Sequence, residues 1–142
     1  MGVTIKANNS KYSFDMGGGG FFDLRSNIAS ALDDDFGDIY RNIIHCHSSE
    51  MYKENDRVAS EIINSKRLDD EYGDVLDFLY MSDIEGKIGY KTCKKIYDLI
   101  KDIDFGTAGF QYAMYRCPEG DYEVFKWFLK DCYSNKRNMI WS

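Results

Sequence analysis

The stretch from Val75 to Ile103 constrains the fold of this chain more than any other, because it joins two helical patterns through a short loop that contains glycine. Before the loop, apolar side chains recur at helical spacing from Val75 to Tyr80. After the loop, they recur from Cys93 to Ile103 at intervals of three and four residues, which places them on one helix face. The pattern predicts a helical hairpin with one apolar stripe on each arm.

The loop between these two helices has part of the pattern of a calcium-binding EF-hand. Asp83 and Gly86 fall at the third and sixth positions of such a loop. Met81 occupies the first position and Thr92 the twelfth, where a calcium site has carboxylates. Because calcium takes six or more oxygen ligands, this loop lacks the donors for that ion. We therefore expect a calcium-free loop in which Gly86 allows the turn and Lys87 to Gly89 form a short extended piece.

Alternating segments elsewhere in the chain predict β-strands. Residues 3–7 and 12–16 alternate apolar with polar side chains around turn-forming residues 8–10, which predicts a β-hairpin. A third strand is expected near residues 109–115, where the alternation returns. Further helices are expected from near Asp23, from Phe36 to about Ile44, from Ser48 or Ser49 to about Lys66, and from about Asp121 to Tyr133. The predicted class is α+β, with a small antiparallel sheet packed against about five or six helices.

Length and composition limit the classes of protein to consider. The chain has 142 residues, which is typical of a single domain spanning 1–142 with one core. Its apolar runs are short and its amino terminus lacks the features of a signal peptide, so we expect no membrane association and a cytoplasmic location. A formal net charge of −6 opposes direct binding to nucleic acid. The four cysteines form no CxxC pair, so reduced thiols are expected.

A run of four glycines follows the predicted hairpin and precedes two phenylalanines. Backbone amides in a glycine loop before a helix can hold an anion. The run lacks the GKS or GKT ending of a phosphate loop, however, and the acidic Asp23 follows it closely. A tight bend that lets strand and helix pack closely is the simpler interpretation. As an alternative, a pocket for a nucleotide would be walled by Gly17, Gly18, Gly19, Gly20, Phe21 and Phe22.

Two acidic clusters are candidates for binding a basic partner. The first follows residue 32 and is expected to cap the helix that begins at Phe36. The second lies on the helix from Leu68, at spacing i, i+4 and i+7, on the side opposite the apolar stripe. A solvated helix face is one interpretation of the second cluster, and an acidic stripe of about 10 Å for a basic partner is the other. The clusters consist of Asp33, Asp34 and Asp35, and of Asp70, Asp74 and Asp77.

The carboxyl-terminal segment adds one aromatic candidate. Trp141 is the penultimate residue of the chain. A tryptophan at a terminus either docks into the core or offers a contact to a partner. We therefore add Trp141 to the candidate partner-binding residues.

The sequence carries no recognisable catalytic or metal-binding set. His45 and His47 flank Cys46, but residues two apart do not share a helix face, and the chain has no second Cys/His pair at ligand spacing. GxSxG and HExxH motifs are absent from the 142 residues. We therefore expect no enzyme, no metal and no cofactor.

Three motifs resemble a family of small uncharacterised proteins from phages and mobile elements of Firmicutes. They are DMGGGGFFDLR at residues 15–25, DFLYMSDIEGKIGYKTCKKIYDLIKD at 77–102, and FKWFLKDCYSNKRNMIWS at 125–142. In that family an aromatic residue stands where this chain has Gly18. The resemblance implies a genetic context in which small acidic proteins inhibit bacterial immunity, as anti-CRISPR proteins do. It implies the cytoplasm of the bacterial host as the location, and it assigns no role to a single residue.

Two functions of different classes follow from these features. The first is an anti-defence protein, similar to an anti-CRISPR, whose acidic and aromatic surface fills the basic groove of an immune effector such as a CRISPR nuclease and blocks it. The alternative is a sponge that sequesters a nucleotide immune signal in the glycine and aromatic pocket. A structural adaptor or an immunity protein is a third interpretation, and self-association is left open.

Overall fold

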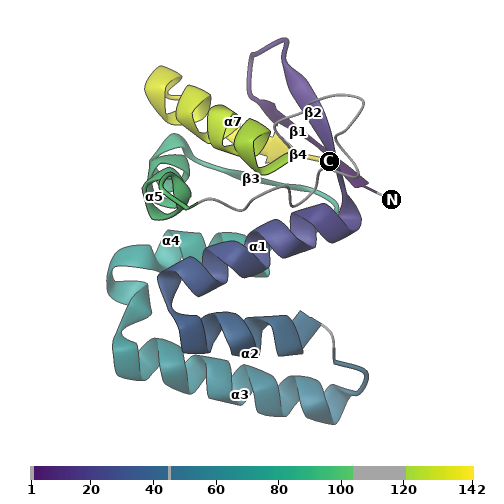
Figure 1. The fold of residues 1–142 in the computed structure, drawn as a ribbon, viewed down its shortest axis with the longest axis vertical. Coiled ribbons are helices and arrows are strands. Elements are labelled where there is room, and N and C mark those ends of the chain that lie inside the picture. The colour runs from purple at the N-terminus through teal and green to yellow at the C-terminus, as the bar shows by residue number, and fades with distance from the viewer. Residues whose placement is uncertain (1, 45, 104–120) are drawn as a thin grey trace.

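The α+β class predicted from the sequence is confirmed in the computed structural model, which describes residues 2–44, 46–103 and 121–142. These residues form six helices and one antiparallel sheet of four strands. Figure 1 shows the sheet, α5 and α7 at one end of the molecule and α2 and α3 at the other, with α1 and α4 between them. The strand expected near residues 109–115 lies outside the described residues. Within the described ranges, no helix is both long and apolar enough to cross a bilayer.

The sheet joins the two ends of the chain. β1 (Gly2–Ala7) and β2 (Ser13–Gly17) form the predicted hairpin. β4 (Met139–Trp141) pairs with the other edge of β1, and β3 (Gly86–Ile88) pairs with β4, so the strand order is β2-β1-β4-β3. β3 confirms a short extended piece after the loop, one residue earlier than expected. β4 was not expected from the sequence, because three residues are too few to show an alternating pattern.

The predicted helical hairpin is confirmed, and its two arms are α4 and α5. Apolar side chains of both arms are fully buried, among them Val75, Leu79 and Ile96. Tyr80, which was placed on the apolar stripe, is partly exposed. The helices are α1 (Gly18–Leu32), α2 (Asp34–Ile44), α3 (Ser49–Lys66), α4 (Leu68–Tyr80), α5 (Tyr90–Ile100) and α7 (Asp121–Asn135).

Helix α1 begins earlier than expected, and this changes the interpretation of the glycine run. Gly17 is the N-cap, with extended backbone angles, and Gly18 is already helical. The prediction that the helix starts near Asp23 was therefore wrong. Glycine costs about 1 kcal/mol per residue in a helix relative to alanine, but burial of Phe21 and Leu24 one turn later offsets this cost.

An aromatic cluster fixes the chain terminus against the helices. The rings of Phe21, Phe78 and Trp141 contact one another, with centroids 5.5 to 6.3 Å apart. Trp141 is only 2% exposed, and its indole Nε1 donates a hydrogen bond to the carbonyl of Ser82 at 3.1 Å. Of the two interpretations of Trp141, the structure shows docking into the core. We therefore leave Trp141 out of the partner-binding residues.

The close approach of β3 to Trp141 makes Gly86 sensitive to substitution. A Cβ atom at Gly86 would collide with the Trp141 ring, which is itself buried in the core. Gly86→Ala should therefore lower the free energy of unfolding by about 1–3 kcal/mol. Gly73 in α4 is the matched control, because a Cβ atom added there would meet no other atom within 4 Å. Gly73→Ala should be neutral or stabilising by up to about 1 kcal/mol.

Urea unfolding monitored by circular dichroism measures both glycine variants. Equal stability of Gly86→Ala and Gly73→Ala would contradict the close packing of the Trp141 ring against the backbone of β3 at Gly86.

Candidate functional site

Charge is unevenly distributed along the chain. Residues 33–85, which include α2, α3, α4 and the loop before β3, contain fifteen Asp and Glu against five Lys and Arg, a formal charge of −10. The whole chain has −6, so the remainder carries +4. We call the described part of residues 33–85 the acidic layer. In Figure 1 its helices α2 and α3 form the end of the molecule opposite the sheet. A separation of charge on this scale produces a negative potential over one part of the surface.

The first acidic cluster starts helix α2, as predicted. An Oδ atom of Asp33 accepts a hydrogen bond from the backbone amide of Phe36 at 2.9 Å, which is the geometry of an N-cap. The Lys66 ammonium at the end of α3 donates to Asp33 at 2.8 Å and to Asp35 at 3.0 Å. Asp34 lies in the first turn of α2 and is exposed. Asp33 and Asp35 therefore tie α2 to α3, while Asp34 faces solvent.

The second cluster is divided among different environments. Asp70 pairs with Arg67 of the preceding turn at 2.9 Å. Asp74 accepts hydrogen bonds from Thr92 Oγ1 at 2.7 Å and Lys95 Nζ at 3.1 Å, both on α5. Asp77 is exposed and forms no ion pair with a described residue. The three aspartates therefore make different contacts, and the prediction that all three line one outer side of the helix is wrong for Asp74, which faces α5.

Packing of α5 beside α4 explains the position of Asp74. Helix α4 is kinked at Tyr72, whose backbone angles (φ −115°, ψ 25°) are not helical, so residue 70 and residue 74 do not lie on one straight helix. Partial burial raises the pKa of Asp74, but hydrogen bonds from Thr92 and Lys95 outweigh this and hold the pKa below its usual value. Asp74 is thus an ionised link between the arms of the helical hairpin.

Exposed apolar side chains accompany the negative charge. The acidic layer holds four of the six large hydrophobic residues that are exposed in the described part of the chain. Their exposed fractions range from 44% to 65%. Tyrosine and methionine are common in binding surfaces, because they combine apolar area with adaptable contacts. These four residues are Met51, Tyr52, Tyr80 and Ile84.

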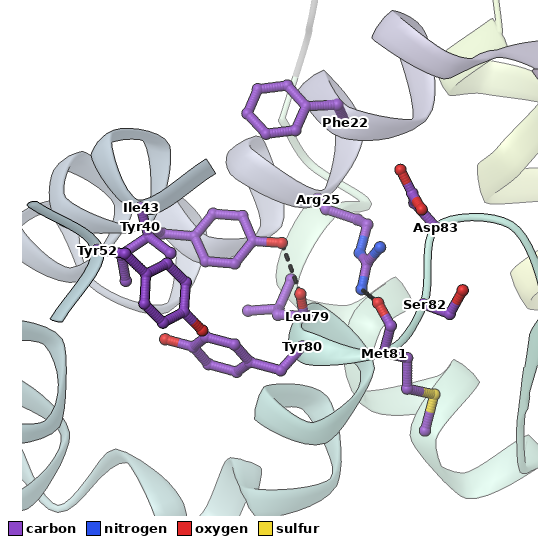
Figure 2. Close-up of a pocket in the computed structure, with 10 residues that line it drawn as sticks. All are labelled: Phe22, Arg25, Tyr40, Ile43, Tyr52, Leu79, Tyr80, Met81, Ser82 and Asp83. Carbon is purple, nitrogen blue, oxygen red and sulfur yellow. Dashed lines mark hydrogen bonds between the residues drawn. The ribbon is translucent and has the colours of Figure 1, made fainter. Parts of the chain in front are cut away.

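A cavity of about 310 Å³ opens among α1, α2, α3 and α4. Figure 2 shows tyrosine rings on one side of this cavity and a guanidinium group on the other, with Phe22 above them. We call it the Arg25 cavity. Its volume is at the lower end of the range for small-molecule sites. It is lined by Phe22, Arg25, Tyr40, Ile43, Tyr52, Leu79, Tyr80, Met81, Ser82 and Asp83.

Arg25 is buried, with only 4% of its surface exposed. Its Nη2 donates hydrogen bonds of 2.6 Å to the carbonyls of Phe78 and Met81, which are at the end of α4. The rings of Phe21 and Phe78 flank the guanidinium, with centroids 5.2 and 5.4 Å from Cζ. The Nε atom of Arg25 has no hydrogen-bond partner among the described residues. The guanidinium therefore has N–H donors that are not used in capping the end of α4.

The tyrosines of the Arg25 cavity are neutral hydrogen-bonding groups. The Tyr40 hydroxyl donates to the carbonyl of Leu79 at 2.6 Å. Burial raises the pKa of Tyr40 to about 12, and burial beside acidic and phenolic groups raises the pKa of Tyr80 to about 12. Both phenols are therefore protonated near neutral pH and can donate hydrogen bonds.

The sequence held a signal for Arg25 that pointed to this site. In α1, buried residues recur at 21, 24, 25 and 28, and Arg25 is the one charged residue in that stripe. A charge inside an apolar stripe requires partners from other elements. Of the glycine and aromatic pocket expected at residues 17–22, Phe22 lines the Arg25 cavity, while Phe21 is buried in the core.

Cysteine and histidine residues form no metal centre in the described ranges. No group of three His, Cys, Asp or Glu side chains in residues 2–44, 46–103 and 121–142 is placed to share an ion. Cys93 and Cys132 are buried free thiols, which confirms the prediction for these two residues. A hydrogen bond with the Cys132 thiol, together with burial, raises the pKa of Cys93. His45 of the HCH triplet lies outside the described residues.

The chain matches no protein-family model, no curated protein sequence and no solved structure. Function must therefore be inferred from the acidic layer and the Arg25 cavity themselves.

The two contacts of Asp33 lead to a prediction for stability. Asp33→Ala removes the N-cap and the pair with Lys66, and should lower the free energy of unfolding by about 1–2 kcal/mol at pH 7. Asp34→Ala, one residue further on, removes neither contact and should change it by less than about 0.5 kcal/mol. Asp33→Asn keeps a side chain that can cap and should fall between them.

The effect of Asp33 should depend on pH. Burial raises the pKa of Asp33, but hydrogen bonds from Lys66 and the Phe36 amide lower it more, so the folded pKa lies below the unfolded one. The stabilisation is therefore fully present above the unfolded pKa of about 4 and is lost as the pH falls through the folded pKa. Urea unfolding at pH 7 and below pH 4 should show the difference between wild type and Asp33→Ala shrinking at acid pH. If the difference in stability between wild type and Asp33→Ala is the same at both pH values, the ionised Asp33 carboxylate is not the source of the stabilisation.

Proposed function

We propose that this protein is a non-enzymatic inhibitor whose acidic layer binds the basic groove of a nucleic-acid-handling immune effector, such as a CRISPR nuclease. The formal charge of −10 on residues 33–85 is the observation that carries this proposal. A groove that holds nucleic acid is lined by Lys and Arg, which bind phosphates through their charge. A protein surface of high negative charge competes for the same groups.

Ion pairs within the acidic layer leave most of its negative charge uncompensated. Lys66, Arg67 and Arg57 pair with acidic neighbours, but acidic residues outnumber basic ones three to one in this part of the chain. Potentials of this kind act over about 8–10 Å at physiological ionic strength. They accelerate association with a partner of opposite charge and orient it on approach.

The exposed tyrosines supply the short-range part of the proposed contact. Charge complementarity sets the rate and selectivity of binding, while buried aromatic anchors supply most of the affinity. Tyr52 and Tyr80 lie within the acidic layer and are partly exposed. The proposed contact residues are therefore Asp34, Asp70 and Asp77 together with these two tyrosines. Asp33, Asp35 and Asp74 contribute charge from within the intramolecular links described above.

The resemblance to proteins of phages and mobile elements supplies the biological part of this proposal. In that context the effector belongs to the immune system of the bacterial host, and the inhibitor acts in the host cytoplasm. The proposal requires neither catalysis nor a cofactor, because occupation of the groove is sufficient to exclude nucleic acid.

A charge-matched pair of variants tests the proposal. Asp34→Asn, Asp70→Asn and Asp77→Asn together remove three negative charges from the acidic layer. The control removes the same number of charges outside residues 33–85, through Asp23→Asn, Asp98→Asn and Asp102→Asn. Exposed charge pairs contribute about 0.5 kcal/mol each, so the first variant should bind about tenfold more weakly at low salt. The control should bind as wild type does.

The assay has two stages. Plasmid interference in cells that carry CRISPR nucleases of different types identifies a nuclease that the protein inhibits. Binding to that purified nuclease is then measured at low and high salt by surface plasmon resonance. Inhibition of none of the nucleases would remove the anti-CRISPR function, and equal affinity of the two triple variants would remove the acidic layer as the contact.

A further inference from the structure

The Arg25 cavity combines a buried cation with aromatic walls, and most of the residues that line it belong to the acidic layer. Arg25 is 4% exposed and lines the cavity, and its Nε has no described hydrogen-bond partner. Leaving a buried donor without a partner costs free energy, and the cost is larger for a charged group. A ligand cannot reach Nε, because that atom is sealed from solvent; the other terminal nitrogen, Nη1, is neither sealed in this way nor used in capping α4, and it is the donor that a ligand in the cavity can meet.

The charge of Arg25 is also incompletely balanced. Its two hydrogen bonds go to the carbonyls of Phe78 and Met81, which are neutral groups. Burial lowers the pKa of Arg25, and the charge of Asp83, on the same side of the cavity (Figure 2), acts to raise it, but no ion pair joins the two side chains in the described structure. A buried guanidinium with neutral partners favours an anion, and two N–H groups of a guanidinium match the two oxygens of a carboxylate.

The remaining walls select the shape of the ligand. Tyr40, Tyr52 and Tyr80 form one side of the cavity, and Phe22 lies over it (Figure 2). The rings of Tyr40 and Tyr80 meet edge to face, with centroids 5.9 Å apart, so their orientation is fixed before any ligand enters. An aromatic wall of this kind favours stacking with a flat ring. A volume of about 310 Å³ fits a ligand of one ring with a small substituent.

We propose that the Arg25 cavity is a binding site for a small planar aromatic ligand that carries a carboxylate. The carboxylate lies at the free N–H of the Arg25 guanidinium, and the ring lies against Tyr40 and Tyr80. The capping of α4 by Arg25 is retained in the bound state, because it uses Nη2 and leaves Nη1 for the ligand.

Titration with benzoate tests this site directly, with benzamide as the neutral probe of the same shape. Isothermal calorimetry and ¹H–¹⁵N NMR of the full chain are the measurements. Benzoate should bind one site with a Kd below about 1 mM, as expected for a ligand of this size, and benzamide should bind at least tenfold more weakly. Absence of saturable binding by benzoate, or equal binding of the two probes, would overturn the proposal.

Two exposed positions locate the binding without disturbing the core. Asp83→Asn removes the carboxylate nearest to Arg25 and should tighten benzoate binding about threefold or more, because that carboxylate repels the ligand. Asp98→Asn makes the same charge change on α5, away from the cavity, and should leave the Kd unchanged. Equal effects of the two variants would show that net charge, and not the Arg25 cavity, governs binding.

The aromatic wall has its own matched pair. Tyr52→Ala removes a partly exposed wall residue and should weaken benzoate binding by about three- to tenfold, whereas Tyr12→Ala removes an exposed tyrosine of the β1–β2 turn and should not. If Tyr12→Ala weakens binding as much as Tyr52→Ala does, the site is wrongly placed. These titrations need no protein partner, so their outcome is separate from that of the inhibition assay.

Discussion

The packing of the buried Trp141 ring against the helices is the interaction on which the rest of the structure depends. β4 has only three residues, yet it lies between β1 and β3 and completes the sheet. It makes three backbone pairs with each of these neighbours, and a terminal strand this short is weakly held unless its side chains also pack. The Trp141 ring supplies the missing stabilisation, since it packs on Phe21 of α1 and Phe78 of α4. One side chain thereby joins the sheet to two helices, and Gly86 is required at β3 because the ring occupies the space of a Cβ atom.

The end of α4 is where the core and the Arg25 cavity meet. Carbonyls of Phe78, Leu79 and Met81 accept hydrogen bonds from Arg25 and Tyr40, and the carbonyl of Ser82 accepts one from Trp141. Helix ends leave carbonyls that need partners, and here the partners come from α1, α2 and β4. The same contacts that end the helix hold the guanidinium and the Tyr40 ring in place. Arg25 and Tyr40 are therefore held in place by the end of α4, and the loop residues Met81, Ser82 and Asp83 line the cavity beside them.

Segregated charge gives the two ends of the molecule different chemistry. The acidic layer combines exposed carboxylates with exposed tyrosines, while the remainder of the chain has a net positive charge. Links such as Lys66 with Asp33 and Lys95 with Asp74 use part of that charge to hold helices together. Asp33 and Asp74 therefore link helices, whereas Asp34 and Asp77 are exposed and make no ion pair with a described residue.

Local pattern determined the β1–β2 hairpin, the α4–α5 hairpin, the cap at Asp33 and the α+β class, because each depends on residues near one another in the sequence. Helix α1 was recognised, but its start was misplaced because burial of Phe21 overrides the low helix propensity of glycine. Only the tertiary structure decided the partners of Arg25, Asp74 and Trp141. The contact of Arg25 with Phe78 spans 53 residues of sequence, and that of Trp141 with Ser82 spans 59. Periodicity identifies a buried side chain, but it carries no information about which distant element completes its hydrogen bonds.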